Sequence, residues 1–247
     1  MADLNDADEV IQLPLDHVAA RLLRHLTEQD KGGVQLHISN VVNGAAWPDI
    51  PVQKRPGFLA TLTEAWDWLV ARGLIASTHY SRNQWGHTFI TRRGESFLAD
   101  PDGLERLQAE RRMEVDLHFR IRDRALPQFL LGEYELAAFA ALREVEIRVR
   151  ELSGAPESLI GVKLMQEAFK ADDGALYDPN LDRGEAEAMM ALFRGAIGVF
   201  KNPSSHRAVD YGSDPVQASE VVLLADLLLR LLDEAEIRLN APDGEES

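Results

Sequence analysis

Residues 132–154 read GEYELAAFAALREVEIRVRELSG and set the character of the C-terminal half of the chain. Leu142 and Val149 lie on one stripe of apolar side chains at helical spacing, which predicts a single helix over residues 134–153. Gly154 follows it as a stop signal, because glycine readily takes the backbone conformation that ends a helix. A helix with such a stripe must pack against other elements.

The chain beyond this helix is expected to be almost entirely helical. Apolar periodicity and helix-start residues predict further helices at 156–170, 184–200, 204–211 and 215–239. The last of these is apolar on most sides, so we expect it at the centre of a bundle or at an oligomer interface. Residues 172–183 contain glycine, proline and several aspartates and are expected to form a solvated loop.

The N-terminal half mixes helices with a short β-structure. Apolar stripes predict helices at 13–29 and 58–71. Residues 34–42 are largely apolar and fit either an extended segment or a helical turn. Two segments rich in β-formers, 74–80 and 85–91, flank a polar tip and predict a β-hairpin.

The pieces WLVARGLI (68–75) and FITRRGESFL (89–98) are similar to the ending common in winged helix-turn-helix domains. Helices followed by a hairpin add to this resemblance, which covers the N-terminal region. Winged helices serve DNA binding, protein docking or scaffolding, so the resemblance implies a fold more than a function.

The sequence Asp100-Pro101-Asp102-Gly103 is the best candidate for a domain boundary. We expect a winged-helix-like domain at 1–100, a charged helical connector at 101–128, a helical bundle at 129–240 and an acidic tail at 241–247. The predicted fold class is therefore mainly α, with one small hairpin.

Composition limits the function classes. The 247-residue chain has no cysteine, which excludes disulfides and thiolate zinc sites. Its formal net charge is -15, with a net of -3 over residues 1–100 and -12 over 101–247, which argues against a generic nucleic-acid coat protein. The acidic start and the lack of an apolar run of about 20 residues predict a cytoplasmic protein without membrane contact.

The segment Lys201-Asn202-Pro203-Ser204-Ser205-His206-Arg207 concentrates groups suited to phosphate chemistry. Asn202 is a good N-cap and Pro203 suits the first turn, so a helix start is predicted there. Helix N-termini attract phosphate, and Lys201 and Arg207 add charge. His206 in the first turn is expected to stay neutral and accept a proton. The alternative is an ordinary helix start whose histidine only caps a carbonyl.

Two segments, FRGAIGVFKNPSSHR (193–207) and the helix at 132–154, resemble the HEPN superfamily of all-helical ribonucleases, and more narrowly its Ymh-type family. The family signature is Arg, often followed by Asn, with four to six residues before His. This chain has the four-residue spacing between Lys201 and His206, with Lys in place of Arg. The resemblance covers about residues 115–240 and implies a HEPN-like helical bundle.

The resemblance also implies site residues. His206 would be the general acid/base, Lys201 would hold the scissile phosphate, and Asn202 would shape the turn. An acidic residue is implied on the first long helix, and Glu146 matches it. Its place in the stripe of Phe139, Leu142 and Val149 predicts that it faces packed structure. Either Glu146 orients His206 or a catalytic cation, or it forms an ordinary pair with the arginines three residues before it and four residues after it. The expected substrate-binding residues are Arg207, Arg194 and Arg150.

The implied function is a metal-independent endoribonuclease that acts as a toxin or as an abortive-infection, anti-phage effector. RNA would be cleaved by attack of its 2′-hydroxyl, without a cofactor or metal. The resemblance implies a homodimer through the C-terminal helices, and an antitoxin or defence-system protein is a further expected partner. The rival interpretation is a non-catalytic winged-helix regulator, with a HEPN-like domain that only dimerises.

One stretch of the N-terminal half is locally basic. From Trp68 to Gly94 there is no acidic residue, and Arg82, Arg92 and Arg93 lie there among aromatic side chains. This surface fits contact with a DNA backbone or a protein partner. It fits a solvated hairpin with a core tryptophan equally well.

Overall fold

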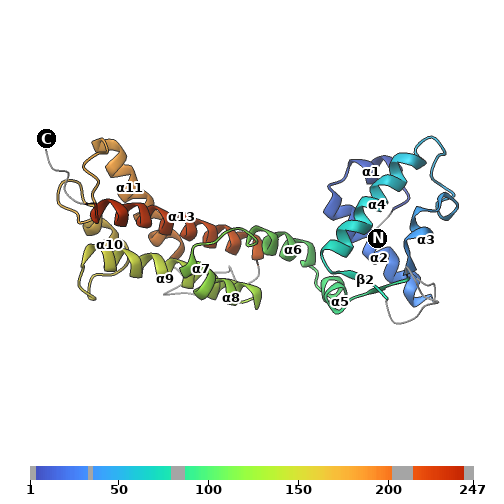
Figure 1. The fold of residues 1–247 in the computed structure, drawn as a ribbon, viewed down its shortest axis with the longest axis horizontal. Coiled ribbons are helices and arrows are strands. Elements are labelled where there is room, and N and C mark those ends of the chain that lie inside the picture. Colours follow the sequence, from blue (N-terminus) through green and yellow to red (C-terminus); the bar gives the residue numbers. More distant parts are fainter. Residues whose placement is uncertain (1–3, 33–35, 79–86, 202–213, 242–247) are drawn as a thin grey trace. The chain divides into compact units, whose positions relative to one another are not determined.

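The computed structural model describes residues 4–32, 36–78, 87–201 and 214–241. It divides the chain into an N-terminal unit, residues 1–104, and a C-terminal unit, residues 105–247 (Figure 1). Both are mainly helical, as predicted. None of the helices in the described ranges has the length and apolar character needed to cross a bilayer.

Helices make up most of the N-terminal unit, and a small sheet lies beside them. Its elements are α1 (Ala7–Gln12), α2 (Leu15–Lys31), β1 (Leu36–His37), α3 (Ile38–Val42), a 3-10 turn (Gly44–Ala46), α4 (Arg55–Ala71), β2 (Ile75–Ser77), β3 (His87–Ile90) and α5 (Arg92–Ala99). Helices α2 and α4 pack on each other, and Leu22, Leu26, Phe58 and Leu62 on them are fully buried.

The described strands form an antiparallel sheet in the order β1-β3-β2. The predicted hairpin is confirmed for β2 and β3, which pair Ile75 with Ile90 and Ser77 with Thr88. Its polar tip lies outside the described residues. Residues 36–42 combine both alternatives considered for them, a short strand and then a helical turn.

The segment Thr91-Arg92-Arg93-Gly94 ties the sheet to α5. Thr91 is the N-cap and accepts from the Gly94 backbone N–H, while its hydroxyl donates to the Gly73 carbonyl at 2.6 Å. A Cβ on Gly94 would lie 2.2 Å from the Leu74 carbonyl oxygen, so only glycine fits there.

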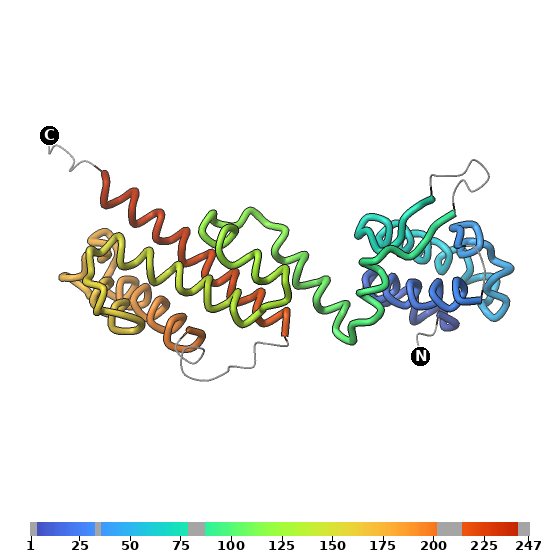
Figure 2. The backbone as a smooth tube through the Cα atoms, turned by 90° about the horizontal axis from the view of Figure 1, so that it is seen from below, coloured from blue at the N-terminus to red at the C-terminus, as the bar shows by residue number. Residues whose placement is uncertain are grey.

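The C-terminal unit is a helical bundle. The chain enters it through α6 (Gly103–Arg112) and continues with α7 (Phe119–Arg124), α8 (Leu126–Leu130), α9 (Tyr134–Ser153), α10 (Gly161–Ala168), α11 (Arg183–Ala196), a π-helical turn (Ile197–Lys201) and α13 (Pro215–Leu239). Helices α9 and α13 run side by side through its centre (Figure 2). Their buried faces include Val145, Val149, Leu228 and Leu229. Of the two positions considered for the last helix, the centre of the bundle is the one observed.

The segment expected as a connector, 101–128, contributes directly to this bundle. Met113, Leu117, Ile121 and Ala125 are buried in the same core cluster as α9 and α13. These apolar residues are spaced widely among charged ones, which is why the sequence suggested a charged helical connector.

The predicted helix at 156–170 starts later than expected, so that prediction is wrong at its N-terminal end. Helix α10 begins at Gly161, and Ile160 before it is extended. The Leu159 carbonyl accepts a hydrogen bond from Arg150 at 3.1 Å. A helix through this position would have used that carbonyl internally, so the tertiary contact replaces the first turn.

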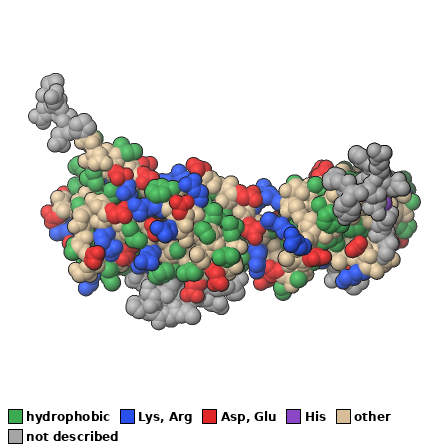
Figure 3. Space-filling view, turned by 60° about the horizontal axis from the view of Figure 1, so that its bottom comes forward, with side chains coloured by type: hydrophobic (Ala, Val, Ile, Leu, Met, Phe, Trp, Pro, Cys, Tyr) green, Lys and Arg blue, Asp and Glu red, His purple; other side chains and the backbone are tan. Residues whose placement is uncertain are grey.

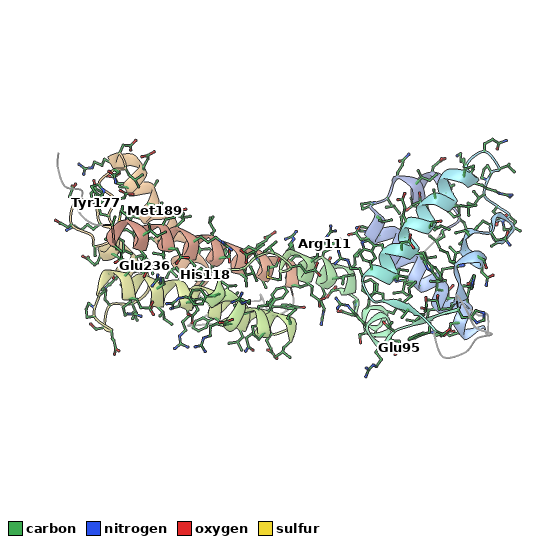
Figure 4. The ribbon with its side chains drawn as sticks, in the orientation of Figure 1. Glu95, Arg111, His118, Tyr177, Met189 and Glu236 are labelled. Atoms are coloured by element: carbon green, nitrogen blue, oxygen red, sulfur yellow. The ribbon has the colours of Figure 1, made fainter. Side chains whose placement is uncertain are left out.

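Charged side chains join α7, α9 and α13. Arg148 on α9 pairs with Glu236 on α13, and Arg120 on α7 pairs with Glu151 on α9 at 2.6 Å. His118, before α7, has Nε2 3.2 Å from Asp233 Oδ2. His118 and Glu236 are labelled in Figure 4. These pairs hold the three helices in register.

The buried carboxylate of Asp226 fastens the start of α7 to α13. It accepts from the His118 backbone N–H at 2.6 Å and from Arg230 Nε at 2.9 Å. We expect Asp226→Ala to lower the free energy of unfolding by about 1–3 kcal/mol, because a buried N–H loses its acceptor. Urea unfolding measures this. Asp123→Ala is the control, since Asp123 is exposed and pairs with its neighbour Arg122. Equal midpoints for the two variants would contradict the assigned role.

Candidate functional site

Lys201 closes the π-helical turn that follows α11. Such turns are rare and often occur at functional positions. The Lys201 ammonium lies 2.7 Å from Glu146 Oε2, on α9, and 5.7 Å from the centre of the Phe139 ring. The side chain is only 14% exposed. The first residue of the Lys201–His206 motif is therefore held against α9.

Glu146 is the centre of this cluster. It is 6% exposed, so the prediction that it faces packed structure is confirmed. Its second oxygen accepts from Arg150 at 3.0 Å. One carboxylate thus bridges two cations, one on its own helix and one brought from a distant segment. The intrahelical pair considered for Glu146 is confirmed with Arg150, and the same carboxylate also contacts Lys201. A role of Glu146 in orienting a catalytic group stays a prediction.

Two opposing effects act on the pKa of Glu146, namely burial and the contacts with cations. Burial alone would raise its pKa, because a charged carboxylate is poorly solvated there. The hydrogen bonds and charges of Lys201 and Arg150 outweigh burial and hold the pKa below its usual value. Glu146 therefore stays ionised at neutral pH. With two cations on one carboxylate, the cluster has a net charge of +1 within a strongly acidic chain.

Comparison with known protein families gives a match in the C-terminal unit. Residues 115–232 match the sequence profile of a family described as "Protein of unknown function (Hypoth_ymh)". The C-terminal unit carries a Ymh-type domain. No curated protein and no solved structure matches the chain.

The matched region of the Ymh-type domain begins before α7 and ends within α13. It includes both Glu146 and Lys201, so the cluster is part of the family domain. It also includes part of the segment that was expected to be a connector.

The other candidate site residues of the Ymh-type domain do not all lie in the cluster around Glu146. Arg150 donates hydrogen bonds to the Glu146 carboxylate and to the Leu159 carbonyl oxygen. Arg194 lies in the last turn of α11, and its Nε is buried without a hydrogen-bond partner among the described residues. Asn202, His206 and Arg207 lie outside the described residues. Their placement beside the cluster therefore rests on the sequence.

In the N-terminal unit, Arg92 and Arg93 are exposed in the first turn of α5, while Arg82 lies outside the described residues. Within the described ranges, no group of three or more His, Asp or Glu side chains could hold a metal ion.

Sequence reasoning missed two parts of the Ymh-type cluster. Phe139 lies two helical turns before Glu146 on the same stripe, so its place beneath Lys201 could have been inferred from spacing. The Leu159 carbonyl has no sequence signal at all, because any residue offers the same acceptor.

The depressed pKa of Glu146 has a consequence for stability. A carboxylate with a lowered folded pKa stabilises the fold above its unfolded value of 4.5, and loses that contribution as the pH falls through the folded value. The unfolding free energies of wild type and Glu146→Gln should therefore differ most at neutral pH and converge below pH 4.5. Denaturant unfolding across this range measures the difference. A gap independent of pH would contradict the assigned ionisation.

Proposed function

We propose that the Ymh-type domain is a metal-independent endoribonuclease of the HEPN type, acting as a toxin or abortive-infection effector. The observation that carries the proposal is the 2.7 Å contact between Lys201 and Glu146. It anchors the start of the Lys201–His206 motif on the central helix, at the position of the acidic residue that the HEPN resemblance implies.

In the proposed reaction, Lys201 binds a non-bridging oxygen of the scissile phosphate. His206 takes the proton of the adjacent 2′-hydroxyl, and the 2′-oxygen attacks phosphorus. The bond to the 5′-oxygen breaks, and that oxygen takes a proton from water as it leaves. The protonated His206 returns its proton to the hydroxide so formed. The products are a 2′,3′-cyclic phosphate and a 5′-hydroxyl end.

The charge of the cluster suits this role. Lys201 and Arg150 share the single carboxylate of Glu146, so the cluster carries one positive charge in excess. Elsewhere on the C-terminal unit, acidic and basic side chains are interspersed on the face drawn in Figure 3. A local excess of positive charge is therefore the feature expected to attract a phosphate.

A homodimer through the C-terminal helices belongs to this proposal, as does an antitoxin or defence-system partner. HEPN nucleases typically join two motifs across a dimer, so a cation from a second copy would complete the site. Arg194 and Arg207 are the further candidates for substrate contact.

For the N-terminal unit we propose a winged helix that docks DNA or a protein. The element order α2-β1-α3-α4-β2-β3 with sheet order β1-β3-β2 supports this. The exposure of Arg92 and Arg93 favours a second candidate function, in which the chain is a non-catalytic regulator and the Ymh-type domain only dimerises.

The test is cleavage of RNA in EDTA. We expect the protein to cut an RNA oligonucleotide and to leave the matched 2′-O-methyl oligonucleotide intact, because the latter lacks the nucleophile. Analysis of the RNA ends should show a 2′,3′-cyclic phosphate. Absence of cleavage, or equal cleavage of both oligonucleotides, would favour the non-catalytic regulator or a different mechanism.

A further inference from the structure

The C-terminal unit contains a second candidate site, away from Lys201. A pocket of about 150 Å³ opens between the loop at 169–181, the first three turns of α11 and the last turns of α13. Met189, on its wall, precedes Lys201 by twelve residues on one continuous helical path, which is on the order of 18 Å. The pocket is therefore separate from the Glu146 cluster.

The floor of the pocket is apolar and buried. Phe169 and Phe193 stack with their ring centres 4.4 Å apart, and Leu176 is buried beside them. Tyr177 and Met189 stand at the sides and are only partly buried; both are labelled at the same end of the unit in Figure 4. Flat aromatic surfaces beneath a partly open wall suit a flat apolar ligand.

The rim of the pocket is polar and carries a net negative charge. Arg238 pairs with Asp178 at 2.8 Å and donates to the Leu176 carbonyl at 3.2 Å, so its charge is compensated. Glu234 is exposed on the same rim. These three side chains together carry a net charge of -1. The rim should favour a neutral or cationic ligand over an anion.

We propose that this pocket binds a single-ring aromatic molecule that is neutral or positively charged. The size and the lining of the pocket support this class of ligand, because an apolar cavity of about 150 Å³ in a protein holds one benzene ring. The ring would lie on Phe169 and Phe193, with its polar substituent directed toward Glu234 and Asp178. This proposal does not depend on the ribonuclease activity.

The test uses three probes with the same ring: benzyl alcohol, benzylamine and benzoate. Labelling the methionine methyl groups with carbon-13 makes Met189 the reporter, while the core residues Met113 and Met165 serve as references within the same unit. Met189→Leu assigns the signal. We expect the Met189 methyl to shift upfield and saturate at millimolar benzyl alcohol and benzylamine, with benzoate binding at least tenfold more weakly.

Two matched variants make the test specific. Ala186→Leu fills the pocket from α11 and should weaken binding of both favoured probes at least tenfold. Ala188→Leu adds the same side chain to the exposed face of that helix and should leave binding unchanged. Glu234→Gln should narrow the preference for benzylamine over benzoate.

An unmoved Met189 methyl in the full-length wild type would overturn the proposal. So would equal binding by Ala186→Leu and Ala188→Leu, since the probes would then lie elsewhere. If benzoate binds as well as benzylamine, the charge preference is overturned.

Discussion

His206→Ala is expected to lower the rate of RNA cleavage in EDTA by at least about 100-fold, the lower end of what a general acid/base contributes. The reason is chemical: in the proposed metal-independent reaction, a side chain must take the 2′-hydroxyl proton at neutral pH. His206 is the histidine that follows Lys201 at the spacing of the HEPN signature.

The control for this experiment is His17→Ala. His17 is exposed on α2 in the N-terminal unit, so its loss should leave cleavage unchanged. Both variants should unfold at the wild-type temperature. Cleavage by His206→Ala at the wild-type rate would remove the histidine from the mechanism and point to a contaminating nuclease.

Position 201 allows a second check on the same reaction. Lys201→Arg restores the residue of the HEPN signature and keeps the positive charge, so cleavage should persist. Lys201→Met keeps much of the apolar stem and removes the charge, so cleavage should fall at least about tenfold. Equal rates for the two variants would mean that the cation does not hold the phosphate.

The second large effect is expected from Glu146→Ala. Truncating this carboxylate should lower the free energy of unfolding by about 3–5 kcal/mol, because two poorly exposed cations lose the negative charge that they share. Both partners show little exposure, with 14% of the Lys201 side chain and 21% of the Arg150 side chain accessible. Denaturant unfolding monitored by circular dichroism measures the loss.

A matched control exists on α11. Glu187 pairs with Arg183 at 3.1 Å with the same four-residue spacing as Glu146 and Arg150, but both side chains are mostly exposed. Glu187→Ala should cost no more than about 1 kcal/mol. If Glu146→Ala is no more destabilising than Glu187→Ala, the cluster is not the anchor described above.

Stability and activity can be separated at this site. Glu146→Gln preserves shape and allows one hydrogen bond, so the variant should stay folded at the assay temperature. We expect it to cleave RNA more slowly than wild type, since Lys201 loses the charge that positions it. Each loss of rate can be expressed as an increase in activation free energy. The increase for the double variant Glu146→Gln with Lys201→Met should then be smaller than the sum of the increases for the two single variants.

Much of the fold could be predicted from the sequence because its signals are local. The stripe of α9 and its glycine stop, Gly154, predicted the helix Tyr134–Ser153 at its observed bounds. The helix predicted at 215–239 likewise has its observed bounds in α13, where the Asp214 side chain caps the start. Backbone preference and periodicity act over one or two turns, so a single sequence reveals them.

The candidate site was only partly predictable. The burial of Glu146 followed from its stripe, but its contact with Lys201 joins positions 55 residues apart. The late start of α10 depends on Arg150 reaching the Leu159 carbonyl, which no local pattern announces.

The sequence by itself determined the helical class, the bounds of α9 and α13, the hairpin and the burial of Glu146, because each depends on neighbouring residues. Only the tertiary structure decided that Lys201 lies on Glu146 and Phe139, and that residues of the supposed connector enter the core. The tertiary structure also decided that the loop at 169–181 forms a pocket lined by aromatic side chains together with α11 and α13. Such contacts depend on how separate helices pack, and packing is set by the shape of the whole core rather than by any one segment.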